Sequence, residues 1–252
     1  MILAIVGYNG GIPVTSNEDL TKMCTTRISD MSSLFYNCDD SDFNQAIGNW
    51  DVSNVTTMKR MFNTECGLGL FNQDLSNWDV RNVTDMSSMF SISNSFNQDL
   101  GNWDVSSVTN MRGMFSNSQF NQDLSNWDVS SVTDMSSMFY NSQFNQDIGN
   151  WDVSNVNSMR GMFYGGIPFS RDIGNWDVSS VTEMSYMFFG NGELNAPIGN
   201  WDVSSVTNMQ SMFMNNSEIN QDLSGWDVSK VTNYIEFDTA TPQWTLPKPN
   251  FN

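Results

Sequence analysis

The sequence contains no histidine, only three cysteines and little positive charge. Histidine is the side chain most often used as a general base, as the activator of a nucleophile, and as a nitrogen ligand of zinc or copper. The ten basic residues are outnumbered by 28 acidic residues, and the net charge of −18 opposes binding to nucleic acid or to an anionic membrane surface. We therefore expect no nucleic-acid partner and no chemistry that depends on histidine.

Long hydrophobic runs are also missing. No segment reaches the roughly 18 apolar residues of a membrane helix, so we expect no membrane insertion. Residues 1–6 are apolar, but the run is short and no basic region precedes it, which predicts that this chain carries no signal peptide. Cys24, Cys38 and Cys66 all lie in the first quarter and cannot staple the whole fold. Cys38 and Cys66 occupy similar places in successive units, and we expect either a disulfide between them or two free thiols.

A repeat makes up most of the chain. Its clearest copy is residues 120–139, Phe-Asn-Gln-Asp-Leu-Ser-Asn-Trp-Asp-Val-Ser-Ser-Val-Thr-Asp-Met-Ser-Ser-Met-Phe. Eight copies follow one another at intervals of 24 to 28 residues, counted between their tryptophans. These tryptophans are Trp50, Trp78, Trp103, Trp127, Trp151, Trp176, Trp201 and Trp226. A fixed period of this size predicts a solenoid, in which stacked units bury one continuous core.

The apolar spacing within one unit predicts two elements. Leu124, Trp127 and Val129 match a leucine-rich repeat with tryptophan in place of the central leucine, and their alternation indicates a short β-strand. The next apolar residues, from Val132 to Phe139, are three or four positions apart, which is typical of one face of a short helix. The expected fold class is a leucine-rich-repeat-like solenoid with a parallel β-sheet on one face and short helical segments on the other.

Both ends of the chain depart from the repeat, as the capping units of a solenoid do. Residues 1–42 are predicted to form an N-terminal cap that contains one degenerate coil. Residues 43–237 form the eight-repeat solenoid, and residues 238–252 form a C-terminal cap or tail.

The tryptophans have two interpretations. A ladder of exposed rings could stack on sugars, whereas the strand periodicity places these side chains in the structural core, and we favour the core. The 18 methionines are similarly interpreted as packing between coils rather than as a soft metal site.

Aspartates form columns on the predicted outer face. One column follows the tryptophans, from Asp51 to Asp227, and the other precedes them, from Asp74 to Asp222. Stacked carboxylates repel one another, so hydrogen bonds from nearby turns or bound cations must relieve the charge. No cofactor is required, but Ca²⁺ is possible. The candidate calcium ligands are Asp79, Asp104, Asp128, Asp152, Asp177 and Asp202.

Enzyme activity is not expected, because no serine, cysteine or aspartate stands out from its repeat equivalents as a nucleophile beside a base. The contact candidates are the broad sheet face of the solenoid and the variable linkers between the Phe139-type and Phe144-type positions, which are residues 140–143 in the clearest copy. Variation confined to one edge of a constant scaffold indicates a recognition surface, and the linkers that vary are 63–70, 91–95, 116–119, 164–168, 189–193 and 214–218. Clustered Tyr, Trp or Arg along that edge would favour a receptor, whereas an exposed apolar patch at one end would favour assembly.

The unit, with Phe-Asn-Gln-Asp-Leu, Asn-Trp-Asp-Val-Ser and Val-Thr-Asp-Met-Ser-Ser-Met-Phe in that order, resembles the repeat of the BspA-like leucine-rich-repeat surface proteins of bacteria, including mycoplasmas. The resemblance covers about residues 43 to 237 and brings no catalytic residue with it. It implies a right-handed solenoid, a surface-exposed location, and adhesion to a protein or glycan receptor. Two alternatives stay open: a structural component of a larger assembly such as a virion, bound to sister proteins, and a calcium-dependent glycan binder.

Overall fold

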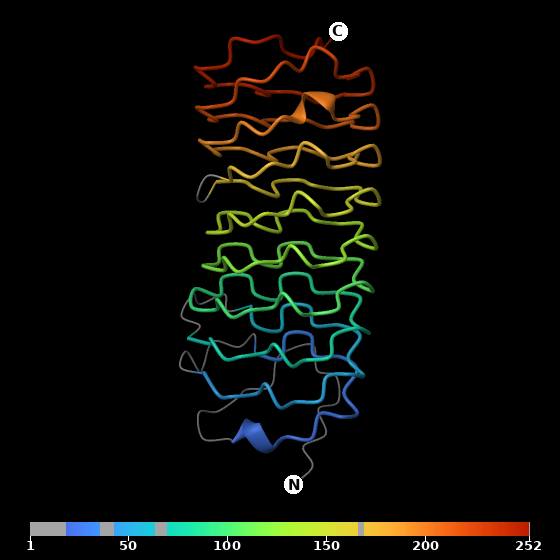
Figure 1. Ribbon diagram of the computed structural model, residues 1–252, viewed down its shortest axis with the longest axis vertical. Helices are drawn as coiled ribbons and strands as arrows, with labels where there is room; N and C mark the ends of the chain where they lie inside the picture. The colour runs from blue at the N-terminus through green and yellow to red at the C-terminus, as the bar shows by residue number, and fades with distance from the viewer. Residues whose placement is uncertain (1–18, 36–42, 64–69, 166–168, 252) are drawn as a thin grey trace.

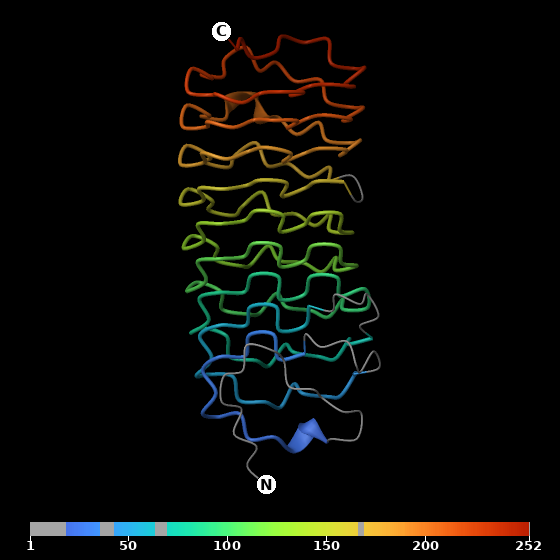
Figure 2. The same cartoon turned by 180° about the vertical axis from the view of Figure 1, so that it is seen from behind.

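The chain forms a column of coils. The computed structural model describes residues 19–35, 43–63, 70–165 and 169–251. Successive repeats lie on one another in the order of the sequence, so the first and last described coils lie at opposite ends (Figure 1). The reverse view shows the same stacking from the other side (Figure 2). Each coil therefore contacts mainly the coils directly before and after it.

Regular secondary structure is nearly absent from the described part of the chain. Two 3-10 helices of three residues each occur, η1 (Leu20–Lys22) and η2 (Ile198–Asn200). Bridges of the β type among the described residues are eight isolated parallel ones, and no described segment forms a strand of a sheet. The bridged residues are Asp30, Thr57, Asp85, Asn110, Asp134, Ser158, Glu183, Asn208 and Asn233.

Tight turns take the place of the expected strand and helix. In the unit around Trp127, three backbone bonds each join an apolar residue to the apolar residue three positions later. The N–H groups of Trp127, Val132 and Met138 donate to the carbonyls of Leu124, Val129 and Met135 at 3.1, 2.9 and 3.1 Å. Each bond closes a β-turn that points both of its apolar ends inward.

Neighbouring coils are joined where the sequence predicts a helix. The N–H groups of Met135, Ser137, Phe139 and Asn141 donate to carbonyls of the following coil at 2.7 to 3.0 Å. The N–H groups between them, including that of Met138, close turns within their own coil. Along this segment, the backbone N–H groups therefore bind alternately to a carbonyl of the next coil and to an acceptor in their own coil. In this way each buried N–H group has a hydrogen-bond partner.

The leucine-rich-repeat interpretation is therefore wrong, and so are its parallel β-sheet and its helical segments. Apolar residues three positions apart fit a helix and also fit the first and last residues of a β-turn. Ser137 has a φ of 58°, and the equivalent residues of other coils also have positive φ, which interrupts any helix. The Trp127 N–H is used inside its own turn, so it cannot pair with a neighbouring strand.

Aromatic columns fill the core along its length. Phenylalanine rings of eight successive coils are stacked with centroids 5.2 to 5.9 Å apart, from Phe35 to Phe213. A second phenylalanine, which opens the next unit, packs against each member from Phe35 to Phe163, as Phe144 does on Phe139 at 3.9 Å. Leu194 occupies this place after Phe188. Buried methionines and valines occupy the remaining inward positions. Burial of these apolar groups is the main stabilising contribution to a fold with so little regular hydrogen-bonded structure.

The C-terminal tail lies on half of the last coil. Trp244 is 6 % exposed and donates its Nε1–H to the carbonyl of Gln221 at 2.8 Å. The N–H of Leu223 donates to the carbonyl of Pro247 at 2.9 Å. On the other half of that coil the Phe251 ring stacks on Tyr234 at 4.5 Å. This half is otherwise open, and Ile235 is 65 % exposed.

Candidate functional site

The aspartate columns form turns. In the column that follows the tryptophans, Oδ1 of Asp128 accepts the N–H and the hydroxyl of Ser130 at 3.0 and 2.6 Å. Asp152 binds Ser154 in the same way. In the column that precedes the tryptophans, Asp123 accepts the N–H of Ser125 at 2.8 Å. These Asx turns position the first residues of the β-turns described above.

The same hydrogen bonds stabilise the charged form of the carboxylates. The serine hydroxyl and then the backbone N–H lower the pKa of Asp104, Asp152 and Asp202 below the ordinary value. Asp79 differs, because Arg81 forms an ion pair with it at 2.7 Å. The charge of the columns is therefore partly compensated within each turn.

The candidate calcium ligands are not gathered into a site. Asp79, Asp104, Asp128, Asp152, Asp177 and Asp202 each direct Oδ1 to the residue two positions later. Within the described ranges, no three acidic or cysteine side chains come close enough to hold one ion. Cys38 and Cys66 lie outside the described residues, and Cys24 is a free, exposed thiol.

The tryptophan column lies in the core. Trp50, Trp78, Trp103, Trp127, Trp151, Trp176, Trp201 and Trp226 are only 3 to 4 % exposed. Each Nε1–H donates at 2.9 to 3.2 Å to a leucine or isoleucine carbonyl of the preceding coil. Their rings are therefore not accessible to a sugar.

An asparagine ladder, which sequence reasoning did not single out, runs along the surface. The N–H of Asn97 donates to the side-chain oxygen of Asn72 at 3.0 Å, and Asn121 binds Asn97 at 2.8 Å. The amide of Gln98 adds a second donor to Asn72. The Asn-Gln pair, present in six of the eight units, was the available signal, because an amide can both donate and accept along a stack.

One surface cluster breaks the repeat, and we call it the aromatic–arginine cluster: Tyr140, Arg160, Tyr164, Tyr186 and Phe189. Tyr140, Tyr164 and Phe189 follow the core phenylalanine of three successive coils, where Ser91 and Ser116 stand in earlier coils. Tyr186 stands at the position of Gly161. The linkers that sequence analysis marked as variable supply three of the five residues. The sequence alone did not show that they meet.

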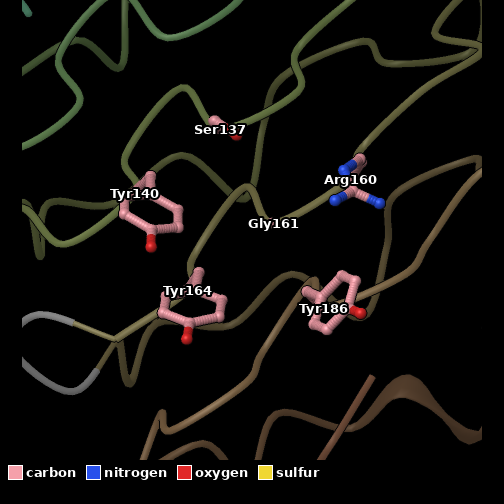
Figure 3. Close-up of a pocket in the computed structure, with 6 residues that line it drawn as sticks. All are labelled: Ser137, Tyr140, Arg160, Gly161, Tyr164 and Tyr186. Carbon is pink, nitrogen blue, oxygen red and sulfur yellow. The ribbon is translucent and has the colours of Figure 1, made fainter. Parts of the chain in front are cut away.

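The rings of the cluster are stacked on one another. The ring centroids of Tyr140 and Tyr164 are 4.5 Å apart, and Tyr164 and Phe189 are also 4.5 Å apart and nearly parallel. The Arg160 guanidinium lies 4.9 Å from the centre of the Tyr186 ring and donates from Nη1 to the Ser185 hydroxyl at 3.0 Å. A hollow of about 160 Å³ lies between the tyrosines and Arg160 (Figure 3).

Two local properties of the tyrosines that line this hollow can be described. Burial, and then the neighbouring phenol of Tyr140, raise the pKa of Tyr164 above its ordinary value. Tyr186 has a φ of 59°, a conformation that is strained for a large side chain and relaxed for glycine. Strain of this kind is often associated with functional sites.

The chain belongs to a repeat family of mycoplasma type. The family described as "Mycoplasma protein of unknown function, DUF285" matches it over residues 10–119, 66–173 and 141–243. The mycoplasma-type repeat indicated by the sequence is thereby confirmed at the level of the family. No curated protein and no solved structure shows significant similarity to the chain. The described residues include no helix with the length and hydropathy of a membrane span.

Proposed function

We propose that the chain is a non-enzymatic recognition protein that is displayed at a surface and binds a receptor along its linker edge. The observation that carries the proposal is the aromatic–arginine cluster, an asymmetric feature on a largely repetitive column of described residues. Tyrosine and arginine are the residues that contribute most often to binding hot spots. A half-buried tyrosine hollow beside an exposed arginine is therefore a suitable contact point.

The resemblance to BspA-like surface proteins supports adhesion as the biological role. Binding through a varied edge on a constant scaffold is common among repeat proteins. The described residues offer little for catalysis, because the aspartates are engaged in their own turns. The proposal therefore includes a surface-exposed location and a receptor as the binding partner.

Adhesion can be tested with beads coated with the protein and applied to cultured animal cells. The decisive variant replaces Tyr140, Tyr164 and Phe189 together by serine, the residue that Ser91 and Ser116 provide at this position. We expect beads with the wild-type protein to adhere and beads with the triple variant to lose most of their adhesion. A matched control replaces Asn126, Asn150 and Asn175 by serine on another face. Equal adhesion of wild-type and triple-variant beads would contradict the proposed site.

A second function, as a component of a larger assembly, is favoured by the open half of the last coil. The N–H groups of Tyr234, Glu236, Asp238 and Ala240 have no acceptor among the described residues, whereas their equivalents in the preceding coil, such as Met209, donate to the last coil. Tyr234 and Ile235 are 45 and 65 % exposed. An apolar edge with unpaired donors is a surface for pairing with a sister protein.

Sedimentation over a wide concentration range tests this alternative. Self-association that is abolished by Ile235→Lys, but kept by Leu70→Lys at another exposed aliphatic residue, would support assembly through the open edge. A monomer at all concentrations would count against association between copies of this chain.

A further inference from the structure

We infer that the aromatic–arginine cluster binds a protein segment in which an acidic side chain lies next to an aromatic one. The carboxylate would bind Arg160, and the aromatic side chain would enter the hollow lined by Tyr140, Tyr164 and Tyr186. This inference rests on the proposed function and specifies the chemistry of the receptor. It selects a protein over a glycan at this site.

The arrangement of the rings favours a protein over a sugar. A pyranose binds aromatic residues by lying flat on a ring face. Here Tyr164 has both faces covered, by Tyr140 on one side and by Phe189 on the other. The guanidinium of Arg160 covers a face of Tyr186. At Tyr164 the ring edge and the hydroxyl are what remain available, and another aromatic side chain packs well on an edge in a T-shaped contact.

Arg160 provides the charge selectivity. Its guanidinium has one hydrogen bond, to Ser185, and takes no part in the three ion pairs formed by the described residues. Arg27, Arg112 and Arg171 are also outside these three ion pairs, and Arg160 is the arginine that lines the hollow. Guanidinium groups bind carboxylates through two parallel hydrogen bonds, which fixes the orientation of the bound group.

Positive φ recurs at this position throughout the repeat, and Tyr186 differs from most of its equivalents in the size of its side chain. A φ of 59° is strained for tyrosine, while Gly161 holds the equivalent position of the preceding coil with a φ of 58°. Glycine at position 186 would remove the strain and also the ring that supports Arg160. A residue that costs stability and contacts the candidate site is expected to contribute to binding.

The test uses blocked dipeptides and NMR of the ¹⁵N-labelled full chain. Acetyl-Phe-Glu-amide is the probe, acetyl-Phe-Gln-amide lacks the carboxylate, and acetyl-Ala-Glu-amide lacks the ring. Methyl glucuronide provides a carboxylated sugar. We expect amides near Gly161, Tyr164 and Tyr186 to shift with acetyl-Phe-Glu-amide at low-millimolar concentration, and each control peptide to bind about tenfold more weakly.

Two variants connect binding to the named residues. Arg160→Gln should abolish the preference for the glutamate over the glutamine peptide, while leaving the folded spectrum intact. Tyr186→Gly should weaken binding of acetyl-Phe-Glu-amide and raise the unfolding midpoint, a combination that simple loss of fold cannot produce. Glucuronide binding as tight as the peptide, or no shifts with any probe, would overturn the inference.

Failure of this inference is distinguishable from failure of the proposed function. Cluster-dependent adhesion of beads without peptide binding would keep the recognition site and reject its chemical class. Peptide binding without adhesion would keep the site and reject adhesion as its role. The two experiments have different readouts, which are bead adhesion and NMR shifts.

Discussion

At the scale of single residues, one carbonyl often serves two partners. The carbonyl of Leu100 accepts the N–H of Trp103 in its own coil at 3.1 Å and Nε1–H of Trp127 from the next coil at 2.9 Å. Both lone pairs of the oxygen are used, so one atom closes a turn and joins two coils. The tryptophan thus contributes a directed bond as well as apolar area.

Replacing Trp127 by phenylalanine tests this contribution. The variant Trp127→Phe removes the bond to Leu100 and leaves a small cavity, and we expect it to lower the free energy of unfolding by about 2 to 3 kcal/mol. Urea denaturation followed by circular dichroism measures the change. A loss no greater than that of an exposed substitution such as Ser107→Ala would contradict the role assigned to the ring nitrogen.

The aspartate turns predict a loss of stability in acid. Hydrogen bonds from serine lower the folded-state pKa of Asp51, Asp104 and Asp227 relative to the unfolded chain. Their stabilising effect is therefore complete above the ordinary pKa of about 3.9 and is lost as pH falls through the lower folded-state value. Thermal unfolding between pH 6 and pH 2 should show this decline, and Asp104→Asn should make it shallower. Constant stability down to pH 2 would contradict it.

The same turns bear on the calcium hypothesis. Because each candidate carboxylate already accepts hydrogen bonds from its own turn, we expect Ca²⁺ to act only by screening charge. The unfolding midpoint should then be equal in millimolar Ca²⁺ and in millimolar Mg²⁺, and only slightly above that in EDTA. A large shift that is specific to Ca²⁺ would instead support a bound cation.

At the scale of elements, the repeat and its family could be predicted, but the strand and the helix could not. The sequence Asp-Met-Ser-Ser-Met has the apolar spacing of a helix and also that of a turn with a preceding aspartate. The positive φ of Ser137 decides between them, and serine gives no signal of it. Gly113 and Gly161 stand at the equivalent position of other coils, and glycine there was the signal in the sequence for a positive φ.

The candidate site was also predictable only in part. The variable linkers drew attention to the stretches that contain Tyr140, Tyr164 and Phe189. Their stacking with one another, and the approach of Arg160 to Tyr186, depend on the register between coils. That register follows from backbone bonds between turns, which the strand-and-helix interpretation had misplaced.

The turn from Met86 to Met89 has a positive φ at its third residue, and this geometry can be tested by substitution. Ser88 has a φ of 54°, so Ser88→Gly should remove strain and raise stability by about 0.5 to 1 kcal/mol. Ser107 lies in another turn of the repeat and does not have a positive φ. Ser107→Gly should therefore lower stability by a similar amount. Chemical denaturation of both variants measures the contrast, and two changes of the same sign would contradict the assigned turn geometry.

At the scale of the whole molecule, the column is a one-dimensional stack. Hydrogen bonds such as those from Thr133 to Thr109 and from Met135 to Ser158 connect only adjacent coils. The stability of such a stack is close to a sum of unit and interface contributions. No coil is therefore indispensable to the rest.

Deleting one whole coil tests this property. Removing residues 97–120 joins Phe96 to Asn121 and preserves the order of the repeat, so we expect a folded protein with a modestly lower unfolding midpoint. Removing only residues 97–108 places the turns out of phase and should prevent cooperative folding. Thermal unfolding and NMR dispersion distinguish the two, and equal behaviour would contradict the stacked architecture.

Near-identical coils also have a consequence for how such a protein changes over generations. A gene made of almost equal segments gains and loses copies by unequal recombination, and each gain or loss lengthens or shortens the column by one coil without disturbing its neighbours. The tyrosines and Arg160 occupy three successive coils, so copies inserted before Tyr140 would move them as an intact unit. The distance between the contact surface and the N-terminal end of the column can then vary, while the chemistry of that surface stays the same.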